Sequence, residues 1–123
     1  MKITIETIPH GDQRYPTAGD WVWIAPGELS IRVSDMGNVR YEAAIGLHEL
    51  VEAILCYDAQ IPQEAVDTFD ALHAKELRAG EPGDDPGAPY REQHCFATAV
   101  ERMLIAALGV PWAEYDAAVE ALL

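Results

Sequence analysis

Strand-like patterns occupy the first third of the chain. Residues 2–8 and 29–33 alternate apolar and polar side chains, and residues 21–24 form a short aromatic and β-branched run. Pro26-Gly27 is a turn signal between the last two of these runs. The pattern therefore predicts a small antiparallel sheet in residues 1–40, with a hairpin at the Pro-Gly turn.

Apolar residues recur at three- and four-residue spacing from residue 41 onward, as a helix with one buried face requires. This spacing predicts a first helix from residue 41 to the break at Ile61-Pro62 and a second helix that continues through Leu77. A third helix is predicted over 91–108, buried around most of its circumference, and a fourth over 112–123.

Residues 79–90 contain three prolines and three glycines and predict a mobile loop between the second and third helices. A chain of 123 residues is long enough to bury roughly two-thirds of its unfolded surface as one domain. We therefore expect a single α+β domain over residues 1–123, with a β region in 1–40 and three to four helices in 41–123.

The first helix combines an apolar stripe with three polar side chains of chemical interest. His48 is expected at the edge of the stripe, Glu52 one step further out, and Glu49 on the polar side. The stripe itself consists of Ala44, Leu47, Val51, Ile54 and Leu55.

The net charge of −13 is concentrated in the helical region. Residues 1–40 hold five acids and four bases, a net of −1, and residues 41–123 hold 16 acids and four bases, a net of −12. Direct nucleic-acid binding and binding to an anionic membrane are disfavoured, because both need clustered Lys and Arg. An acidic surface instead favours solubility or a basic protein partner.

Cysteine usage and the N-terminal segment predict a cytoplasmic protein. Cys56 and Cys95 are far apart and outside any C-x-x-C pair, so both are expected to be buried free thiols. The first residues lack the apolar region of a signal peptide, and no stretch approaches the roughly 20 apolar residues of a membrane span.

The segment Leu47-His48-Glu49-Leu50-Val51-Glu52 carries the clearest chemical signal. In a helix, His48 and Glu52 lie four residues apart on the same side, as two metal ligands would, and Glu49 sits beside them as a general base. A hydrolytic zinc site usually has three protein ligands and an open fourth position. Three residues are candidates for the third ligand, in this order: His94, Asp70 and His73.

This segment resembles the H-E-x-x-H motif of the zincin metallopeptidases, with Glu52 in place of the second His. The resemblance implies a zincin-like fold, metal ligands at His48 and Glu52, and a base at Glu49. A zinc ion is expected, or manganese or iron because a carboxylate suits a harder metal. The strand before the helix would align an extended peptide substrate by edge pairing. The small acidic layout also resembles proteins encoded in bacteriophage and prophage genomes.

Other interpretations of the same residues remain open. A Glu- and Leu-rich helix can produce this spacing by chance, with His48 at the core boundary and both glutamates in solvent. The all-α nucleoside-triphosphate pyrophosphatases place similar carboxylates on consecutive helices, here Glu49 and Glu52 followed by Glu64 and Asp67, although that fold has no N-terminal strands.

The acids of the 79–90 loop form a second group of candidate ligands. Glu81, Asp84 and Asp85 do not have the spacing of an EF-hand calcium loop, and we expect them to be solvated.

Two functions follow from the sequence. The first is a metal-dependent hydrolase of peptide or amide bonds, in which His48, Glu52 and His94 hold the metal and Glu49 is the catalytic base. The second is a non-enzymatic acidic interaction or inhibitor protein, of the kind that phages encode, which binds a basic protein partner.

Overall fold

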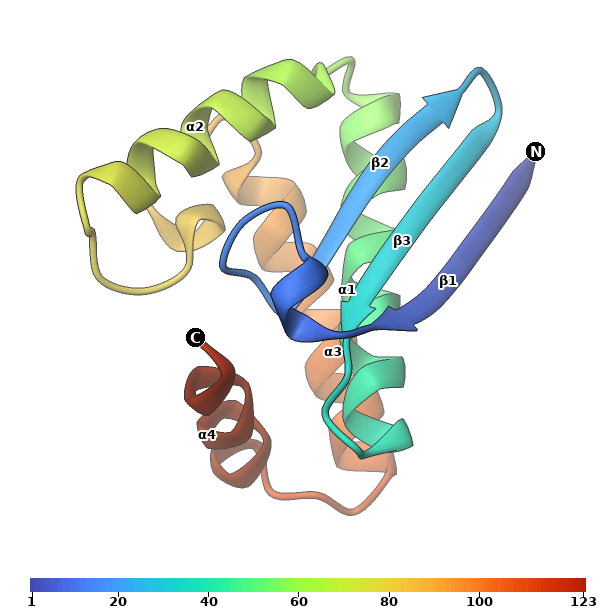
Figure 1. Ribbon diagram of the computed structural model, residues 1–123, viewed down its shortest axis with the longest axis vertical. Helices are drawn as coiled ribbons and strands as arrows, with labels where there is room; N and C mark the ends of the chain where they lie inside the picture. Colours follow the sequence, from blue (N-terminus) through green and yellow to red (C-terminus); the bar gives the residue numbers. More distant parts are fainter.

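The computed structural model describes all 123 residues as an N-terminal sheet followed by helices, which confirms the predicted α+β class (Figure 1). The strands are β1 (Lys2–Ile8), β2 (Gly19–Ala25) and β3 (Glu28–Ser34). The helices are α1 (Val39–Asp58), α2 (Gln63–Lys75), α3 (Arg91–Ala107) and α4 (Trp112–Leu122), with short 3-10 turns η1 (His10–Asp12) and η2 (Pro82–Asp84).

The sheet is mixed, with the strand order β1-β3-β2, and the prediction of a purely antiparallel sheet is wrong. β2 and β3 form the expected antiparallel hairpin, whereas β1 pairs with β3 in parallel. The connection through η1 passes the end of β3, because Ile8 pairs with Ser34 and Gly19 pairs with Val33. Alternation of side chains is the same in both strand directions, so the sequence pattern could not distinguish them.

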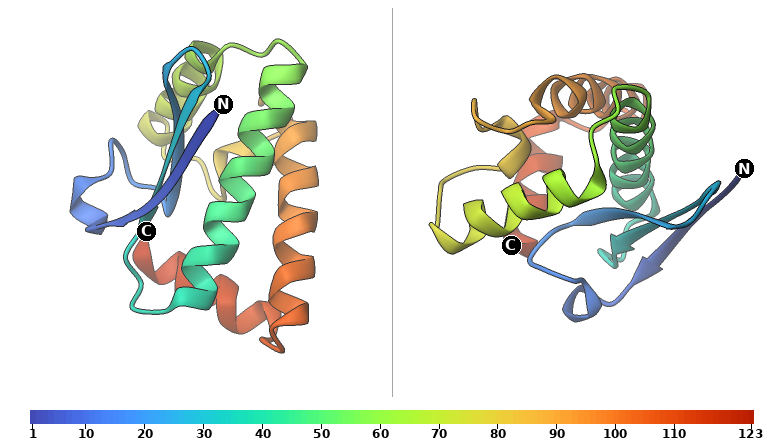
Figure 2. Two further views of the ribbon diagram at one scale, coloured as in Figure 1. Left: turned by 90° about the vertical axis from the view of Figure 1, so that its right-hand side faces the viewer. Right: turned by 90° about the horizontal axis from the view of Figure 1, so that it is seen from above.

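α1 lies between the sheet and α3, and the two long helices run side by side (Figure 2). The apolar face of β3 supplies the sheet side of the core, where Leu29, Ile31 and Val33 are almost completely buried. Asn38 is the N-cap of α1, and its side chain accepts hydrogen bonds from the backbone N–H groups of Arg40 and Tyr41.

α2, η2 and α4 lie on one side of this α1–α3 pair (Figures 1 and 2). η2 contacts both α2 and α3, and α4 packs on α3 after a sharp bend. The segment 79–90 contains η2 and buries Gly83, Ala88 and Tyr90. No helix is long and apolar enough to cross a membrane alone.

Burial on α1 differs from the predicted stripe. His48 and Glu52 are buried, with 7% and 6% of their surfaces exposed, whereas Leu47 and Val51 are only half-buried. Because α1 contacts both the sheet and α3, its buried surface is broader than one apolar stripe, and it includes polar side chains that find partners there.

Three further burial predictions are wrong. α3 is largely solvent-facing, with Phe96 and Met103 exposed, because only one side of it packs on α1 and α4. Cys95 is exposed on that outer side, whereas Cys56 is buried as expected. The helix that was predicted to continue through Leu77 ends at Lys75, and Leu77 is exposed instead of packed.

Candidate metal centre

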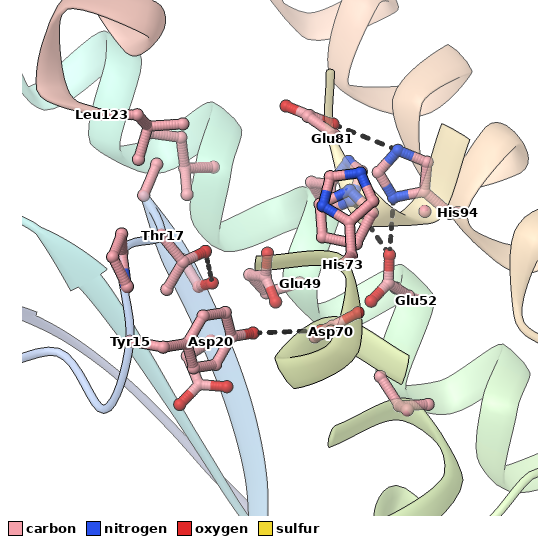
Figure 3. Close-up of a pocket in the computed structure, with 18 of the residues that line it drawn as sticks. Tyr15, Thr17, Asp20, Glu49, Glu52, Asp70, His73, Glu81, His94 and Leu123 are labelled. Carbon is pink, nitrogen blue, oxygen red and sulfur yellow. Dashed lines mark hydrogen bonds and ion pairs between the residues drawn. The ribbon is translucent and has the colours of Figure 1, made fainter. Parts of the chain in front are cut away.

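A cavity of about 460 Å³ opens between β2, α1, α2, η2, α3 and the C-terminal end of α4. Figure 3 shows acidic and imidazole side chains from these elements gathered in one place. The cavity wall thus combines residues from most of the fold, and its polar groups come largely from the helices.

Three buried side chains bring their ligand atoms together in this cavity. His48 Nε2 lies 3.1 Å from Glu52 Oε2, one turn along α1. His94 Nδ1, from the first turn of α3, lies 2.9 Å from the same oxygen. The two nitrogens and the oxygen are all within 4.8 Å of one another. His48 and Glu52 face the same side of α1, as their four-residue spacing predicted, and His94, the first of the three further candidates, reaches the same oxygen.

The spacing of these atoms fits a small divalent cation. Zinc binds nitrogen and carboxylate oxygen at about 2.0–2.2 Å, which puts tetrahedral ligand atoms roughly 3.4 Å apart. Two imidazoles and one carboxylate are suitable ligands for zinc and for manganese or iron. The side chains of His48, Glu52 and His94 can therefore reach one ion with small adjustments.

The electrostatics of the cluster favour two protonated rings beside an ionised Glu52. Burial opposes a charged His94 ring, but its contacts with Glu52 and Glu81 outweigh burial and raise its pKa to about 10. The pKa of His48 is raised well above its usual value because Glu101 and Glu52 outweigh burial in the same way. Burial also opposes the charged form of Glu52, but the two rings lower its pKa to about 2. Metal binding here would release protons from both rings.

Surrounding groups fix the orientation of the cluster. Glu101 Oε1 lies 2.8 Å from His48 Nδ1, and Tyr115 donates a hydrogen bond to the other Glu101 oxygen. Trp21 Nε1 donates to Glu52 Oε1 at 3.0 Å, leaving Oε2 to the two rings. A carboxylate behind a histidine in this manner presents the far nitrogen to a metal.

Neither Glu101 nor Trp21 was predicted from the sequence as part of the site. Glu101 follows His94 by seven residues, so the two share one face of α3, and that spacing was a usable signal. Trp21 reaches Glu52 from β2 across 31 positions of sequence, and no local pattern indicates this contact.

Glu49 lines the cavity close to Glu52. In Figure 3 it has no polar partner among the residues drawn. Gly19 lies directly against it, because a Cβ at Gly19 would be 2.7 Å from Glu49 Cγ and 2.9 Å from its Oε1. Burial, followed by the charge of Glu52, raises the pKa of Glu49 well above its usual value.

The rival third ligands lie outside the cluster. Asp70 accepts hydrogen bonds from Tyr15, at 3.3 Å, and from Tyr90, which occupy both of its oxygens. His73 is buried in the cavity wall, and its Nε2 has no hydrogen-bond partner, but it is not part of the three-atom group.

The pyrophosphatase interpretation also needs Glu64 and Asp67 of α2, and neither belongs to the cluster. Glu64 is exposed, and both oxygens of Asp67 bind Arg14.

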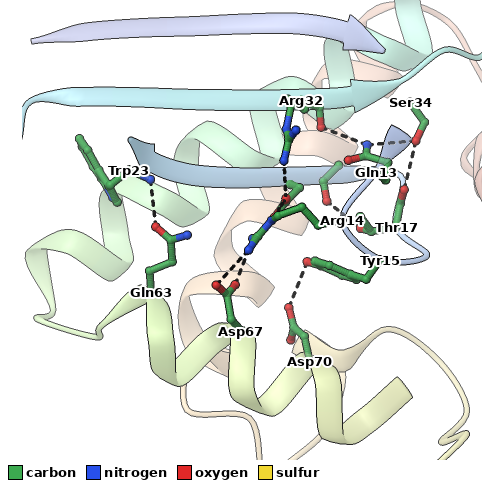
Figure 4. Close-up of polar contacts among 12 residues, drawn as sticks. Gln13, Arg14, Tyr15, Thr17, Trp23, Arg32, Ser34, Gln63, Asp67 and Asp70 are labelled. Atoms are coloured by element: carbon green, nitrogen blue, oxygen red, sulfur yellow. Dashed lines mark hydrogen bonds and ion pairs between the residues drawn. The ribbon is translucent and has the colours of Figure 1, made fainter. Parts of the chain in front are cut away.

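The wall beside β2 is held by ion pairs and hydrogen bonds (Figure 4). The Arg14 guanidinium binds the buried Asp20 at 2.7 and 2.9 Å and Asp67 of α2 at 3.2 Å. Arg32 lies 3.7 Å from the same Asp20 carboxylate. These contacts tie α2 to the sheet across the cavity.

Comparisons with known proteins give no family for this chain. No protein-family model, curated protein or solved structure matches it. The resemblance to zincins and to phage proteins therefore stays a prediction from the His48–Glu52 segment and the acidic composition.

Proposed function

We propose that this protein is a divalent-metal-dependent hydrolase of peptide or amide bonds. In this proposal His48, Glu52 and His94 hold the ion, and Glu49 is the catalytic base. The observation that carries it is the meeting of one carboxylate oxygen with two imidazole nitrogens, at 3.1 and 2.9 Å, in the wall of a cavity.

The ligand set supports hydrolysis in particular. Catalytic zinc sites have three protein ligands and keep the fourth position for water or substrate, and here the ligands adjoin a cavity large enough for part of a peptide. When bound, such an ion polarises a carbonyl group and lowers the pKa of water to about 7. Zinc is the expected ion, and manganese or iron would also suit the His–Glu–His set.

Glu49 would accept a proton from the attacking water and pass it to the leaving nitrogen. Its place one residue after His48 and beside Glu52 puts its carboxylate in the same cavity as the ligands. Gly19 leaves room for this side chain, since a larger residue there would displace it.

β2, rather than β3, would align an extended substrate. The strand that precedes the helix is β3, which lies in the centre of the sheet and has no free edge, so the expected use of that strand is wrong. β2 is an edge strand, and Gly19, Asp20 and Trp21 at its start line the cavity.

The first experiment measures metal content and hydrolysis together. Protein purified without chelator should retain zinc at one ion per chain or more. His48→Ala should reduce this zinc content, whereas His10→Ala should not, because His10 lies outside the cavity.

Glu49→Gln should keep the metal and abolish cleavage of fluorogenic peptide amides. Glu64→Gln, at an exposed glutamate, is the matched control. Metal content that His48→Ala leaves unchanged would overturn the proposal.

The rival function is that of an acidic interaction protein, which the net charge of −12 in residues 41–123 favours. Under it the protein would capture a basic protein in a manner strongly weakened by salt. Salt-sensitive capture combined with absence of bound metal would replace the hydrolase proposal by this one.

A further inference from the structure

The second nitrogen of His94 has no hydrogen-bond partner. The ring is 5% exposed, and its Nδ1 is occupied by Glu52. Nε2 lies 3.1 Å from Glu81 Oε2 and 3.2 Å from Asp84 Oδ1, yet neither contact has the geometry of a hydrogen bond. A buried ring nitrogen thus points between two carboxylate oxygens.

The turn η2 packs closely against the His94 ring. Glu81 precedes the turn, Asp84 ends it, and Gly83 between them packs on the face of His94. A Cβ at position 83 would overlap the ring, so only glycine lets the turn come this close. Figure 3 shows His94 between Glu81 on one side and Glu52 on the other.

We propose that Glu81, Asp84 and Nε2 of His94 form a second divalent-cation site beside the first. Their ligand atoms all lie within 4.8 Å of one another, and two of the three ligands belong to this site alone. Two carboxylates and one imidazole suit manganese or zinc. The site does not depend on the proposed hydrolase activity, because it would bind its ion whether or not the cavity is catalytic.

His94 belongs to both candidate sites, because its Nδ1 contacts Glu52 and its Nε2 lies between Glu81 and Asp84. An ion held at Nε2 would displace the hydrogen that this nitrogen carries in the charged ring, while Nδ1–H would still donate to the side chain at position 52. A variant that lacks the first-site ligands therefore tests the second site by itself.

The second ion would tie the loop 79–90 to α3. η2 contacts both α2 and α3, and Glu81 and Gly83 line the cavity. An ion there joins exposed carboxylates of the loop to a buried ring, so the loop should resist opening when the ion is bound.

The test uses the double variant His48→Ala/Glu52→Gln, which removes two first-site ligands and leaves a Gln oxygen to accept from Nδ1–H. Titrated with Zn²⁺ or Mn²⁺, the folded variant should still bind one ion per chain. Adding Glu81→Gln/Asp84→Asn should weaken this binding by about tenfold or more. The matched control is Glu76→Gln/Asp85→Asn, which makes the same charge change at acids that pair with Arg78 and should bind as before.

Trypsin cleavage after the exposed Arg78 gives a second measurement, for use if the double variant does not fold. In the otherwise unaltered protein the metal should slow this cleavage, and Glu81→Gln/Asp84→Asn should remove the protection while first-site binding remains. Failure of Glu81→Gln/Asp84→Asn to change either ion binding or protection overturns the second site. A protein that shows both effects but cleaves no peptide instead contradicts only the hydrolase proposal.

Discussion

Glu101 determines which nitrogen His48 offers to the cavity. Its carboxylate holds Nδ1 at 2.8 Å, so that Nε2 faces Glu52 and His94. We predict that Glu101→Gln lowers zinc affinity by about 10- to 100-fold, since a neutral amide orients and polarises the ring less well. Competition with a chromophoric chelator measures the change. Glu114→Gln, at an exposed carboxylate of α4, is the control, and equal affinities for the two variants would contradict this role.

The buried Asp70 carboxyl should make the stability of the folded protein depend on pH. Burial raises its pKa from 3.8 to about 6, against the lowering effect of the hydrogen bond from Tyr90. Between about pH 4 and pH 6 the folded protein retains a proton that the unfolded chain has lost. The free energy of unfolding therefore falls as pH rises through this range, by up to about 3 kcal/mol. Asp70→Asn should remove this slope. Urea unfolding with a chelator present, at a series of pH values, tests it, and parallel curves for both proteins would contradict it.

Only part of this residue-level detail follows from the sequence. His48 and Glu52 were predicted to share a side because helix geometry alone fixes a four-residue spacing. Their burial was not predicted, because hydropathy treats them as surface residues and contains no information about Trp21 or Glu101 across the fold. His94 was ranked before Asp70 from the sequence, but the two tyrosines that occupy both Asp70 oxygens were not predicted.

At the scale of elements, Arg14 makes the ion pairs that connect α2 to the sheet, beside a hydrogen bond from the Trp23 backbone N–H to Gln63. Arg14 links the buried Asp20 of β2 to Asp67 of α2. Arg14→Ala should destabilise the fold by about 2 kcal/mol, because Asp20 would remain buried with only Arg32 nearby, at 3.7 Å.

Chemical denaturation measures this cost. Arg78→Ala, which removes a solvent-exposed ion pair, should change stability little. If the two variants unfold at the same urea concentration, Arg14 is not what holds α2.

Element positions were more predictable than element partners. Helix and strand locations followed from periodicity, and α3 and α4 end within one residue of the predicted limits. The direction of β1 and the two-sided burial of α1 depend on which elements meet in space. Periodicity within one segment does not contain that information, because it reports only whether one face is apolar.

At the scale of the whole molecule, the cavity lies within the acidic part of a chain of net charge −13. A divalent cation bound there would relieve some of this repulsion and would bind only the folded chain, because His94 is 42 positions from Glu52. Zinc at about 100 times its dissociation constant should raise the melting temperature by about 10 °C.

Thermal unfolding with and without zinc tests this expectation. Excess chelator should reverse the increase, and His48→Ala should reduce it. An increase that persists in a variant lacking both metal clusters would indicate general charge screening instead.

The mixed sheet has a consequence for how the molecule opens. None of the β1 side chains is fully buried, and β1 is hydrogen-bonded to the sheet only through β3. Detaching it therefore costs little free energy, and no ligand or supporting residue of the cavity belongs to it. Hydrogen exchange should find the β1 amides exchanging well before those of β3 that pair with β2. The protein would then pass through brief openings at one sheet edge while the side chains of the candidate metal centre stay packed.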